Sequence, residues 1–482
     1  MTPHATWLVL APLLFLMQVG FALLTTGLCR AKNAGHVVSA NLIILVCSIL
    51  AFWIFGFAIM FGGLGSSPMA AKAQAVLAGD LQGLDREWLG LAGCHGFFYS
   101  PLAIGSGGVP LFIIAALLVS IASVIPAAAM AERWSFKNIV LYGFWVSLPL
   151  AFFGNWVWGG GWLSQLGQSW GLGHGVVDFA GSSVVHMAGG TIALAGSSLL
   201  GARAGKYSRD GRPRPMPGHN LVFVVIGTML LFAGWFGFDS ASPFADPSDE
   251  LGILGLNTLL AGGAGGFAAY VVTARKFGKA DPSMLCNGVL AGLVAISASG
   301  PFVNSIAAVM IGVVAGFIVV HSVIYFEGRL KVDDPIGAIS VHGVCGVWGL
   351  LSLGLFANGK FGAGWNGLHT MFKGGVVQVV SDTSDLASRL SDGWTDIGVT
   401  GALGKLFGAP TSDWSQLGAQ CVGAVAGVVF VGAIALAGFK ISGLIVPLRV
   451  RRDAELSGLD LPETGAECYP DFHLTDKGQT GV

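Results

Sequence analysis

Apolar runs as long as a membrane-spanning helix recur along the whole chain, and this feature restricts its possible folds more than any other. A helix needs about 20 apolar residues to cross the roughly 30 Å hydrocarbon core of a bilayer. Only 11% of the 482 residues are charged, too few for large aqueous domains. The sequence therefore predicts an all-α membrane protein with eleven transmembrane helices. Their expected positions are about 6–29, 37–63, 108–131, 137–158, 177–201, 220–242, 253–275, 284–300, 303–326, 335–357 and 416–447.

The basic residues indicate which way these helices run. With an odd number of crossings the two termini lie on opposite sides of the membrane, and short cytoplasmic loops carry an excess of Lys and Arg. Placing Arg449, Arg451 and Arg452 inside the cell puts 19 of the 25 Lys and Arg residues on the cytoplasmic face and leaves 6 outside. The sequence therefore predicts the N-terminus out and the C-terminus in.

The remaining segments define the expected domain organisation. Residues 1–448 form the transmembrane domain, with outer loops at about 64–107 and 358–415, and residues 449–482 form a cytoplasmic tail. The outer loops either build a cap outside the membrane or are partly disordered. The net charge is −1 and no dense basic run occurs, so nothing resembles the electrostatic footprint of a nucleic-acid binder.

Two segments of the chain are alike at an offset of 156 residues. One runs from Asp178 to His186 and the other from Asp334 to His342, with further matching Gly and Val residues. Five expected helices separate equivalent points, so the two copies run in opposite directions, as in transporters built from inverted repeats. We therefore expect an inverted five-plus-five helix repeat. Its halves lie at about 6–201 and 220–357.

His186 and His342 are the strongest functional candidates, because ionisable side chains inside a membrane are costly and rare. Each lies eight residues beyond the aspartate of its segment, about 12 Å along a helix that rises about 1.5 Å per residue. Helices that start from opposite faces bring both imidazoles near the midplane, which predicts a pair that lines a pore. The alternative is a buried structural histidine in each helix.

Asp178 and Asp334 open the two repeated segments, and each has a structural explanation. Aspartate at a helix N-terminus caps backbone N–H groups and interacts favourably with the helix dipole. We expect this capping role for both. Asp178 is also expected to attract a cation at the outer face through its field rather than by direct contact.

Aromatic and hydroxyl side chains occur where the expected fourth and sixth helices reach the outer face. Trp158 lies at the end of the fourth, and Phe238 and Ser242 lie four residues apart on one face of the sixth. An aromatic face and a hydroxyl oxygen together can bind a small cation. The alternatives are an interfacial aromatic belt for Trp158 and ordinary packing at a helix end for Phe238.

The order of these motifs resembles that of the ammonium transporter family (Amt/Mep/Rh), and most closely its bacterial and archaeal Amt branch. The resemblance covers nearly the whole chain. It implies eleven helices, an inverted repeat, and a homotrimer with one pore per subunit in the lipid bilayer of the cell membrane. The motifs that carry it begin at Phe15, Arg30, Ala131, Trp158, Asp178, Gly234, Asn287 and Val332.

The resemblance also implies a role for each candidate. Trp158 and Ser242 match the outer site that recruits ammonium, and Phe238 matches the inner of two stacked gating phenylalanines. His186 and His342 match the twin histidines of the pore. Ammonium would lose its proton at the outer site and pass the histidines as ammonia, with methylammonium as an analogue. No cofactor or metal is implied.

Leu118 stands where the family has its outer gating phenylalanine, and this departure keeps two functions open. The first is an inward ammonium transporter, and the second is an ammonium sensor that conducts poorly. A membrane enzyme with His186 and His342 as metal ligands is a weaker alternative, because a zinc site needs further protein ligands. We therefore expect no enzyme.

The tail resembles the C-terminal signature of the family between Gly458 and Tyr469. In the family, subunits communicate and PII signal proteins dock around this signature. The resemblance therefore implies a regulatory tail with a PII-type partner at the cytoplasmic face. The alternative is a solvated, partly disordered tail.

Overall fold

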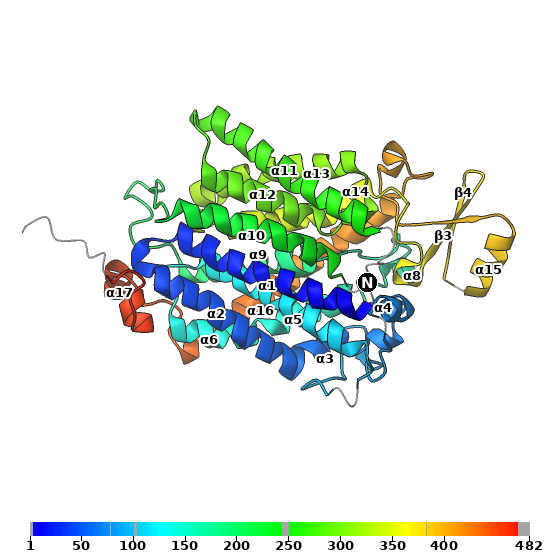
Figure 1. The fold of residues 1–482 in the computed structure, drawn as a ribbon, viewed down its shortest axis with the longest axis horizontal. Helices are drawn as coiled ribbons and strands as arrows, with labels where there is room; N and C mark the ends of the chain where they lie inside the picture. Colours follow the sequence, from blue (N-terminus) through cyan, green and yellow to red (C-terminus); the bar gives the residue numbers. More distant parts are fainter. Residues whose placement is uncertain (1–2, 78, 101–103, 243–249, 382, 471–482) are drawn as a thin grey trace, which may run out of the picture.

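The computed structural model describes residues 3–77, 79–100, 104–242, 250–381 and 383–470, and these form an elongated bundle of helices (Figure 1). Helices suit a membrane because each backbone N–H and C=O group finds its partner within the segment. Ten helical stretches in the described residues are long and apolar enough to cross one. They are Val9–Leu28, Ala31–Ser66, Gly108–Ala129, Phe136–Val157, Ser182–Leu200, Leu221–Ser240, Leu251–Phe277, Ser305–Leu330, Ile339–Phe356 and Trp414–Ile445.

The helix expected at 284–300 is shorter than these ten. It forms α12 (Pro282–Ile296), whose 15 residues cover about 22 Å, less than the roughly 30 Å of hydrocarbon. Asp281 caps its N-terminus, and Pro282 occupies the first turn, where a missing N–H costs nothing. Beyond its end the chain tightens into a 3₁₀ turn (Gly300–Phe302) that contains Pro301. The described chain thus has ten long apolar helices and this shorter one, where eleven spans were expected.

Several spans consist of consecutive helical elements. Four of the spans contain a π-helical turn, a feature that is frequent at functional sites. Two of these turns, η4 (Ser182–Met187) and η7 (Ile339–Val344), contain the candidate histidines. The other elements of the bundle are α1 (Pro3–Leu28), α2 (Ala34–Ala51), η2 (Phe52–Gly56), α3 (Phe57–Phe61), α5 (Gly108–Ala129), α6 (Phe136–Trp145), α7 (Ser147–Val157), α8 (Leu166–Trp170), α9 (Ala188–Leu200), α10 (Leu221–Ser240), α11 (Glu250–Phe277), α13 (Ser305–Tyr325), η6 (Phe326–Leu330), α14 (Cys345–Phe356) and α16 (Trp414–Ile445).

The two long loops that are expected outside the membrane are folded where the structure describes them. The first contains α4 (Ala70–Leu77) and a two-stranded ribbon of β1 (Glu87–Trp88) and β2 (Ala92–Gly93). The second contains α15 (Thr383–Ser391) and an antiparallel sheet in which β3 lies between β4 and β5. The chain is therefore mostly helical rather than all-α. The strands are β3 (His369–Lys373), β4 (Val376–Val380) and β5 (Thr395–Ile397).

The tail lies at the opposite end of the bundle from this sheet (Figure 1). It forms α17 (Arg452–Ser457) and the π-helical turn η10 (Asp460–Thr464). Asp460 accepts a hydrogen bond from the N–H of His36 at 2.8 Å, and Glu455 accepts one from the N–H of Ala204 at 2.6 Å. The described part of the tail therefore contacts the start of α2 and the loop at Ala204, while many of its other residues are exposed. Its regulatory role stays a prediction. Residues 471–482 lie outside the described residues.

Candidate functional site

The two helices that carry the histidines begin in the same way. Asp178 accepts hydrogen bonds from the N–H of Gly181 at 2.9 Å and from the N–H of Ser183 at 2.8 Å. Asp334 accepts hydrogen bonds from the N–H of Gly337 at 3.0 Å and from the N–H of Ile339 at 2.7 Å. Both glycines have positive φ, 116° and 83°, which glycine adopts without steric cost. Equivalent residues thus build the same cap at both ends of the site.

The same two helices cross through glycines. A Cβ atom on Gly190 would lie 2.1 Å from the backbone nitrogen of Gly343, and one on Gly346 would lie 2.6 Å from the backbone nitrogen of Met187. The offset of 156 residues relates Gly190 to Gly346 and Met187 to Gly343, so the two contacts are equivalent in the two halves of the repeat. Small residues let membrane helices approach this closely. The crossing brings the two candidate histidines together inside the bundle.

His186 and His342 are in direct contact. Their Nδ1 atoms lie 3.1 Å apart, and their ring centroids lie 5.1 Å apart with the planes inclined at 24°. Both are buried, with exposed fractions of 0% and 3%. When both rings are neutral, one Nδ1 donates and the other accepts, so the two Nε2 atoms have opposite hydrogen-bonding roles. The Nε2 atom of His186 has no hydrogen-bond partner among the described residues. The pair therefore keeps hydrogen-bonding capacity for a small polar guest.

Three aromatic side chains pack on the pair. Trp235 stacks on His186 with centroids 5.0 Å apart, and Phe238 lies 5.2 Å from the same ring. Phe21 lies 5.7 Å from the ring of His342. Sequence reasoning singled out Phe238 but missed the other two. Trp235 could have been found, since it precedes Phe238 by three residues and lies on the same helix face.

The other outer candidates are buried, and one of them contacts a cap. Trp158, which is 3% exposed, donates from Nε1 to the carbonyl oxygen of Asp178 at 2.7 Å. Its ring also packs over Gly181. Ser242 is buried two residues beyond the end of α10, and Leu118 is part of the apolar core in α5. The structure thus joins Phe238 to the histidines and Trp158 to Asp178, whereas Leu118 sits in apolar packing.

α16 holds the segment that leads to Asp178. The side-chain amide of Gln416 accepts a hydrogen bond from the N–H of His174 at 2.9 Å. It also donates one to the carbonyl oxygen of Gly175 at 2.8 Å. Gln420 accepts from the N–H of Val177 at 3.0 Å and donates to its carbonyl oxygen at 2.6 Å. Both amides thus satisfy backbone groups of an extended segment. Burial lowers the pKa of His174 to about 4, so its ring is neutral at pH 7.

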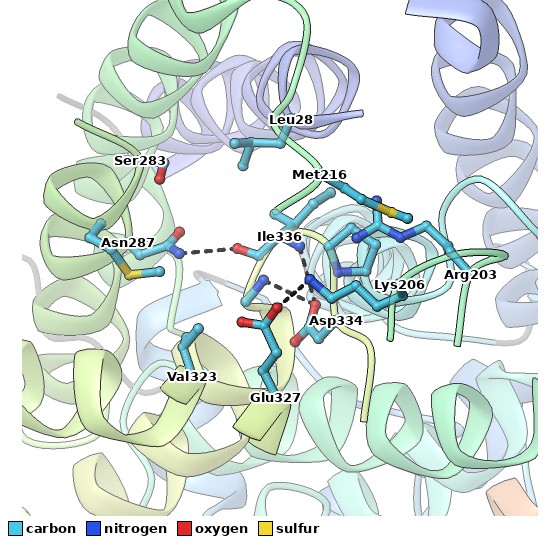
Figure 2. Close-up of a pocket in the computed structure, with 13 residues that line it drawn as sticks. Leu28, Arg203, Lys206, Met216, Ser283, Asn287, Val323, Glu327, Asp334 and Ile336 are labelled. Atoms are coloured by element: carbon cyan, nitrogen blue, oxygen red, sulfur yellow. Dashed lines mark hydrogen bonds and ion pairs between the residues drawn. The ribbon is translucent and has the colours of Figure 1, made fainter. Parts of the chain in front are cut away.

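A cavity of about 110 Å³, the inner cavity, lies at the other end of the site (Figure 2). A narrow cavity of about 10 Å³ shares Asn287 and Ile336 with it and reaches His342. A space of that size holds about one water-sized guest. Small cavities therefore lead from the histidines toward the end of the bundle that carries the tail. The residues that line the inner cavity include Arg203, Lys206, Asn287, Glu327, Asp334 and Ile336.

Buried charges join the loops around the inner cavity. Arg203 donates to Asp333 at 2.9 and 3.0 Å and to Glu132 at 3.1 Å. Arg30 pairs with the other oxygen of Glu132. Burial raises the pKa of Asp333, but Arg133 and Arg203 outweigh it and lower this pKa to about 2. Sequence reasoning used these arginines only to orient the helices, because a sequence does not show which loops meet.

The sequence matches one known family over nearly the whole chain. A sequence profile of the Ammonium Transporter Family matches residues 5–469. The chain belongs to the ammonium transporter family. It is 36% identical to the ammonium transporter Amt2 of Archaeoglobus fulgidus over 467 residues, which cover 96% of this chain and 87% of that relative. It is 30% identical to ammonium transporter 1 member 3 of Solanum lycopersicum, over 95% of this chain and 91% of that relative.

Solved structures show the same fold. A structure described as a sensor Amt protein matches with a TM-score of 0.76 and 29% identity, over 96% of this chain and 98% of that one. The Mep2 structure from Saccharomyces cerevisiae matches with a TM-score of 0.71 and 21% identity, over 93% and 90% of the two chains. Membership of the ammonium transporter family confirms the assignment made from the order of motifs. The chain is a multi-pass membrane protein of this family, while the roles of single residues stay predictions.

Proposed function

We propose that this chain moves ammonium inward across the cell membrane, through a pore in each subunit, and that it is not an enzyme. The observation that carries the proposal is the 3.1 Å contact between the Nδ1 atoms of His186 and His342. The two buried rings can accept from and donate to a passing ammonia molecule. The Nε2 atom of His186 has no hydrogen-bond partner among the described residues and is therefore available to such a molecule.

The chemistry follows from the cost of burying a charge. An intact ammonium ion would lose its hydration in an apolar path, which favours release of a proton and passage of neutral ammonia. The proton can cross separately if one Nε2 atom takes up a proton, the shared proton passes between the two Nδ1 atoms, and the other Nε2 atom releases its proton. These three transfers together leave both rings neutral with their tautomers exchanged. Potassium has no proton to release and is therefore rejected.

Recruitment is assigned to the outer end of the site. Trp158 and Ser242 are proposed to bind ammonium there, and Phe238 to separate that site from the histidines. The contact between Phe238 and the His186 ring, at 5.2 Å, supports this position for Phe238. Asp178 and Asp334 are proposed to be caps, as their backbone hydrogen bonds suggest, with Asp178 adding its field at the outer end.

The proposed topology has eleven crossings, with the short α12 as the eighth. The N-terminus is placed outside, and α1 begins at the end of the bundle that carries the outer sheet (Figure 1). The exchangeable contacts at Gly190 and Gly346 support an inverted repeat of the halves 6–201 and 220–357. The proposed domains are the membrane domain 1–448 and the tail 449–482. The family alone implies the homotrimer.

The tail is proposed to be regulatory, with a PII-type protein as its partner. Its support is the contact of α17 with the loop beside the inner cavity. Glu455 accepts from the N–H of Ala204, next to Arg203 in the cavity wall. A change in the tail can therefore reach residues that line the path.

An ammonium sensor with little transport is the second candidate function. Two observations favour it. Leu118 replaces the aromatic ring expected at the outer gate, and the chain is 29% identical to a structure described as a sensor Amt protein. In this alternative, ammonium binds at the same outer site but the packed tail carries the signal.

Uptake of labelled methylammonium by cells without carriers of their own tests the proposal. Cells that express the chain should accumulate the label above empty-vector cells, and unlabelled ammonium should compete. If the protein is present in the membrane but both kinds of cell accumulate the same amount of label, transport is contradicted. The sensor function is then the remaining candidate.

A further inference from the structure

A cavity of about 250 Å³, the sheet cavity, lies at the end of the bundle opposite the tail. Its wall is formed by the start of α16, the segment after α8, and the strands β3 and β4 (Figure 1). One water molecule needs about 10–15 Å³ of such a cavity, so a guest of about a dozen non-hydrogen atoms fits. The described residues that line it are not those of the inner cavity or of the narrow cavity at His342. The sheet cavity is therefore separate from the path past the histidines.

Most of the polar side chains in the wall of the sheet cavity are hydroxyls. Each hydroxyl can donate one hydrogen bond and accept others. Val377 and Val379 of β4 give the wall an apolar side. The wall therefore suits a molecule that has both hydroxyl groups and an apolar face. The hydroxyls belong to Thr370, Thr400, Thr411, Ser412 and Ser415.

His174 adds a hydrogen-bonding atom that has no partner. Its side chain is 3% exposed and belongs to the wall. Nε2 lies 3.4 Å from the Thr370 hydroxyl oxygen, whereas Nδ1 has no hydrogen-bond partner among the described residues. A buried polar atom without a partner is costly unless a ligand or a water molecule supplies one. The ring therefore offers one hydrogen bond to a guest.

The wall carries little net charge. Among the described residues that line it, His174 and Asp413 are the ionisable ones, and the low pKa of His174 keeps its ring neutral at pH 7. Oδ1 of Asp413 accepts from the N–H of Ser415 at 2.8 Å and from its hydroxyl at 2.5 Å. Asp413 is the N-cap of α16, so the helix dipole offsets its negative charge. The wall therefore favours an uncharged polar guest over an ion.

Two exposed tryptophans adjoin the wall in the sequence. Trp170 precedes Gly171 of the wall and is 63% exposed, and Trp414 lies between Asp413 and Ser415 and is 66% exposed. A Cβ atom on Gly171 would meet nothing within 4 Å, so the space beside Trp170 is open. Tryptophan has a large apolar face and one N–H donor. Sugar rings pack their C–H faces on such a surface while their hydroxyls form hydrogen bonds.

We propose that the sheet cavity binds a small uncharged sugar, with Trp170 and Trp414 at its rim. The sugar hydroxyls exchange hydrogen bonds with the wall hydroxyls and with Nδ1 of His174, and its C–H faces lie against valine and tryptophan. Interfacial anchoring is the other common role of exposed tryptophans in a membrane protein, and it predicts no affinity for sugars. The sugar site does not depend on the proposed transport.

Maltose, a neutral disaccharide, is the probe. Calorimetry measures its binding to the full chain in lipid nanodiscs, because detergents with sugar head groups would compete for the site. One maltose should bind per subunit with a Kd on the order of 1 mM or lower. Choline, a cation, should not bind at the same concentrations.

Four variants locate the site. Trp170→Ala and Trp414→Ala should each raise the Kd for maltose about fivefold, the effect of one lost aromatic contact. Thr370→Val keeps the shape of the side chain but removes a wall hydroxyl, and it should also raise the Kd. Trp88→Ala is the matched control, since Trp88 is 57% exposed and neither it nor its neighbours in the sequence line the cavity.

Three outcomes would overturn the inference. If the folded native chain gives no heat with maltose, the cavity holds only water. If maltose binds equally to the native chain and to the Trp170, Trp414 and Thr370 variants, the sugar binds elsewhere. If choline binds and maltose does not, the wall selects charge. Methylammonium uptake by the same protein reports separately on the proposed function, so failure of one proposal is distinguishable from failure of the other.

Discussion

The Nδ1 atoms of His186 and His342 lie 3.1 Å apart, so the tautomer of each ring is fixed by the other. This relationship links two residues that are 156 positions apart and approach from helices with the same cap. One Nε2 then accepts and the other donates. In the proposed transport, a passing ammonia molecule would meet both kinds of partner.

We predict that His186→Ala and His342→Ala keep the fold but change what the path conducts. Each removes a hydrogen bond worth about 1.4 kcal/mol, so the ratio of ammonium to potassium current should change about tenfold. Currents in reconstituted vesicles check this. His321→Ala is the control, since that ring is exposed and bonds to its own helix. Unaltered currents and selectivity in both variants would reject a relay.

Gly190→Ala should prevent the two helices from crossing. Its Cβ would lie 2.1 Å from the backbone nitrogen of Gly343, which cannot move aside as a flexible side chain can. Overpacking of this kind costs about 1–3 kcal/mol or more. Gly263→Ala is the matched control, because nothing lies within 4 Å of its Cβ. Thermal unfolding in detergent should show a lower midpoint for Gly190→Ala only, and equal midpoints would contradict the close crossing.

His174 should make stability depend on pH. Burial lowers its pKa from 6.5 in the unfolded chain to about 4, against the opposing effect of Asp413 and with a small lowering by His369. Between these values the unfolded chain binds more protons, so stability is complete above pH 6.5 and falls as the pH drops toward 4. The difference of about 2.5 units corresponds to about 3 kcal/mol.

His174→Gln is the variant that isolates this effect. Its amide can still contact Thr370, which lies 3.4 Å from Nε2 of the native ring. The loss of unfolding free energy between pH 7 and pH 4.5 should be smaller in the variant than in the native chain. If the unfolding free energy falls equally with pH in the variant and in the native chain, His174 does not cause the pH dependence.

Much of the fold could be predicted because long apolar helices leave a strong signal. The eighth segment was the least regular, since α12 has only 15 residues and ends at Ile296, before the turn that contains Pro301. The outer sheet left a weak signal, because β3, β4 and β5 have at most five residues each. Their pairing is decided by contacts between segments rather than by local sequence.

The histidine pair could be predicted because the repeat places both residues at equivalent depth. The π-helical turns that contain them could not, since no sequence spacing distinguishes such a turn from an ordinary helix. The buried network of Arg203, Glu132 and Asp333 was also missed. Its members come from three loops, and only the fold shows that they meet.

Leu118→Phe should restore an aromatic face at the outer site. An added cation–π contact is worth about 0.5–1 kcal/mol, so half-maximal ammonium current should occur at a concentration a few fold lower. Leu118 is 2% exposed, so the variant must still be shown to fold. Leu117→Phe in the same helix is the control. An unchanged concentration dependence in Leu118→Phe would remove this residue from the outer gate.

The central claim is that this chain transports ammonium rather than only sensing it. The most direct measurement is the current that a jump in ammonium concentration triggers in vesicles reconstituted with the native chain, across a concentration series. The account predicts a saturating current with ammonium and none with potassium. Absence of current while ammonium still binds to the protein would contradict transport and favour the sensor.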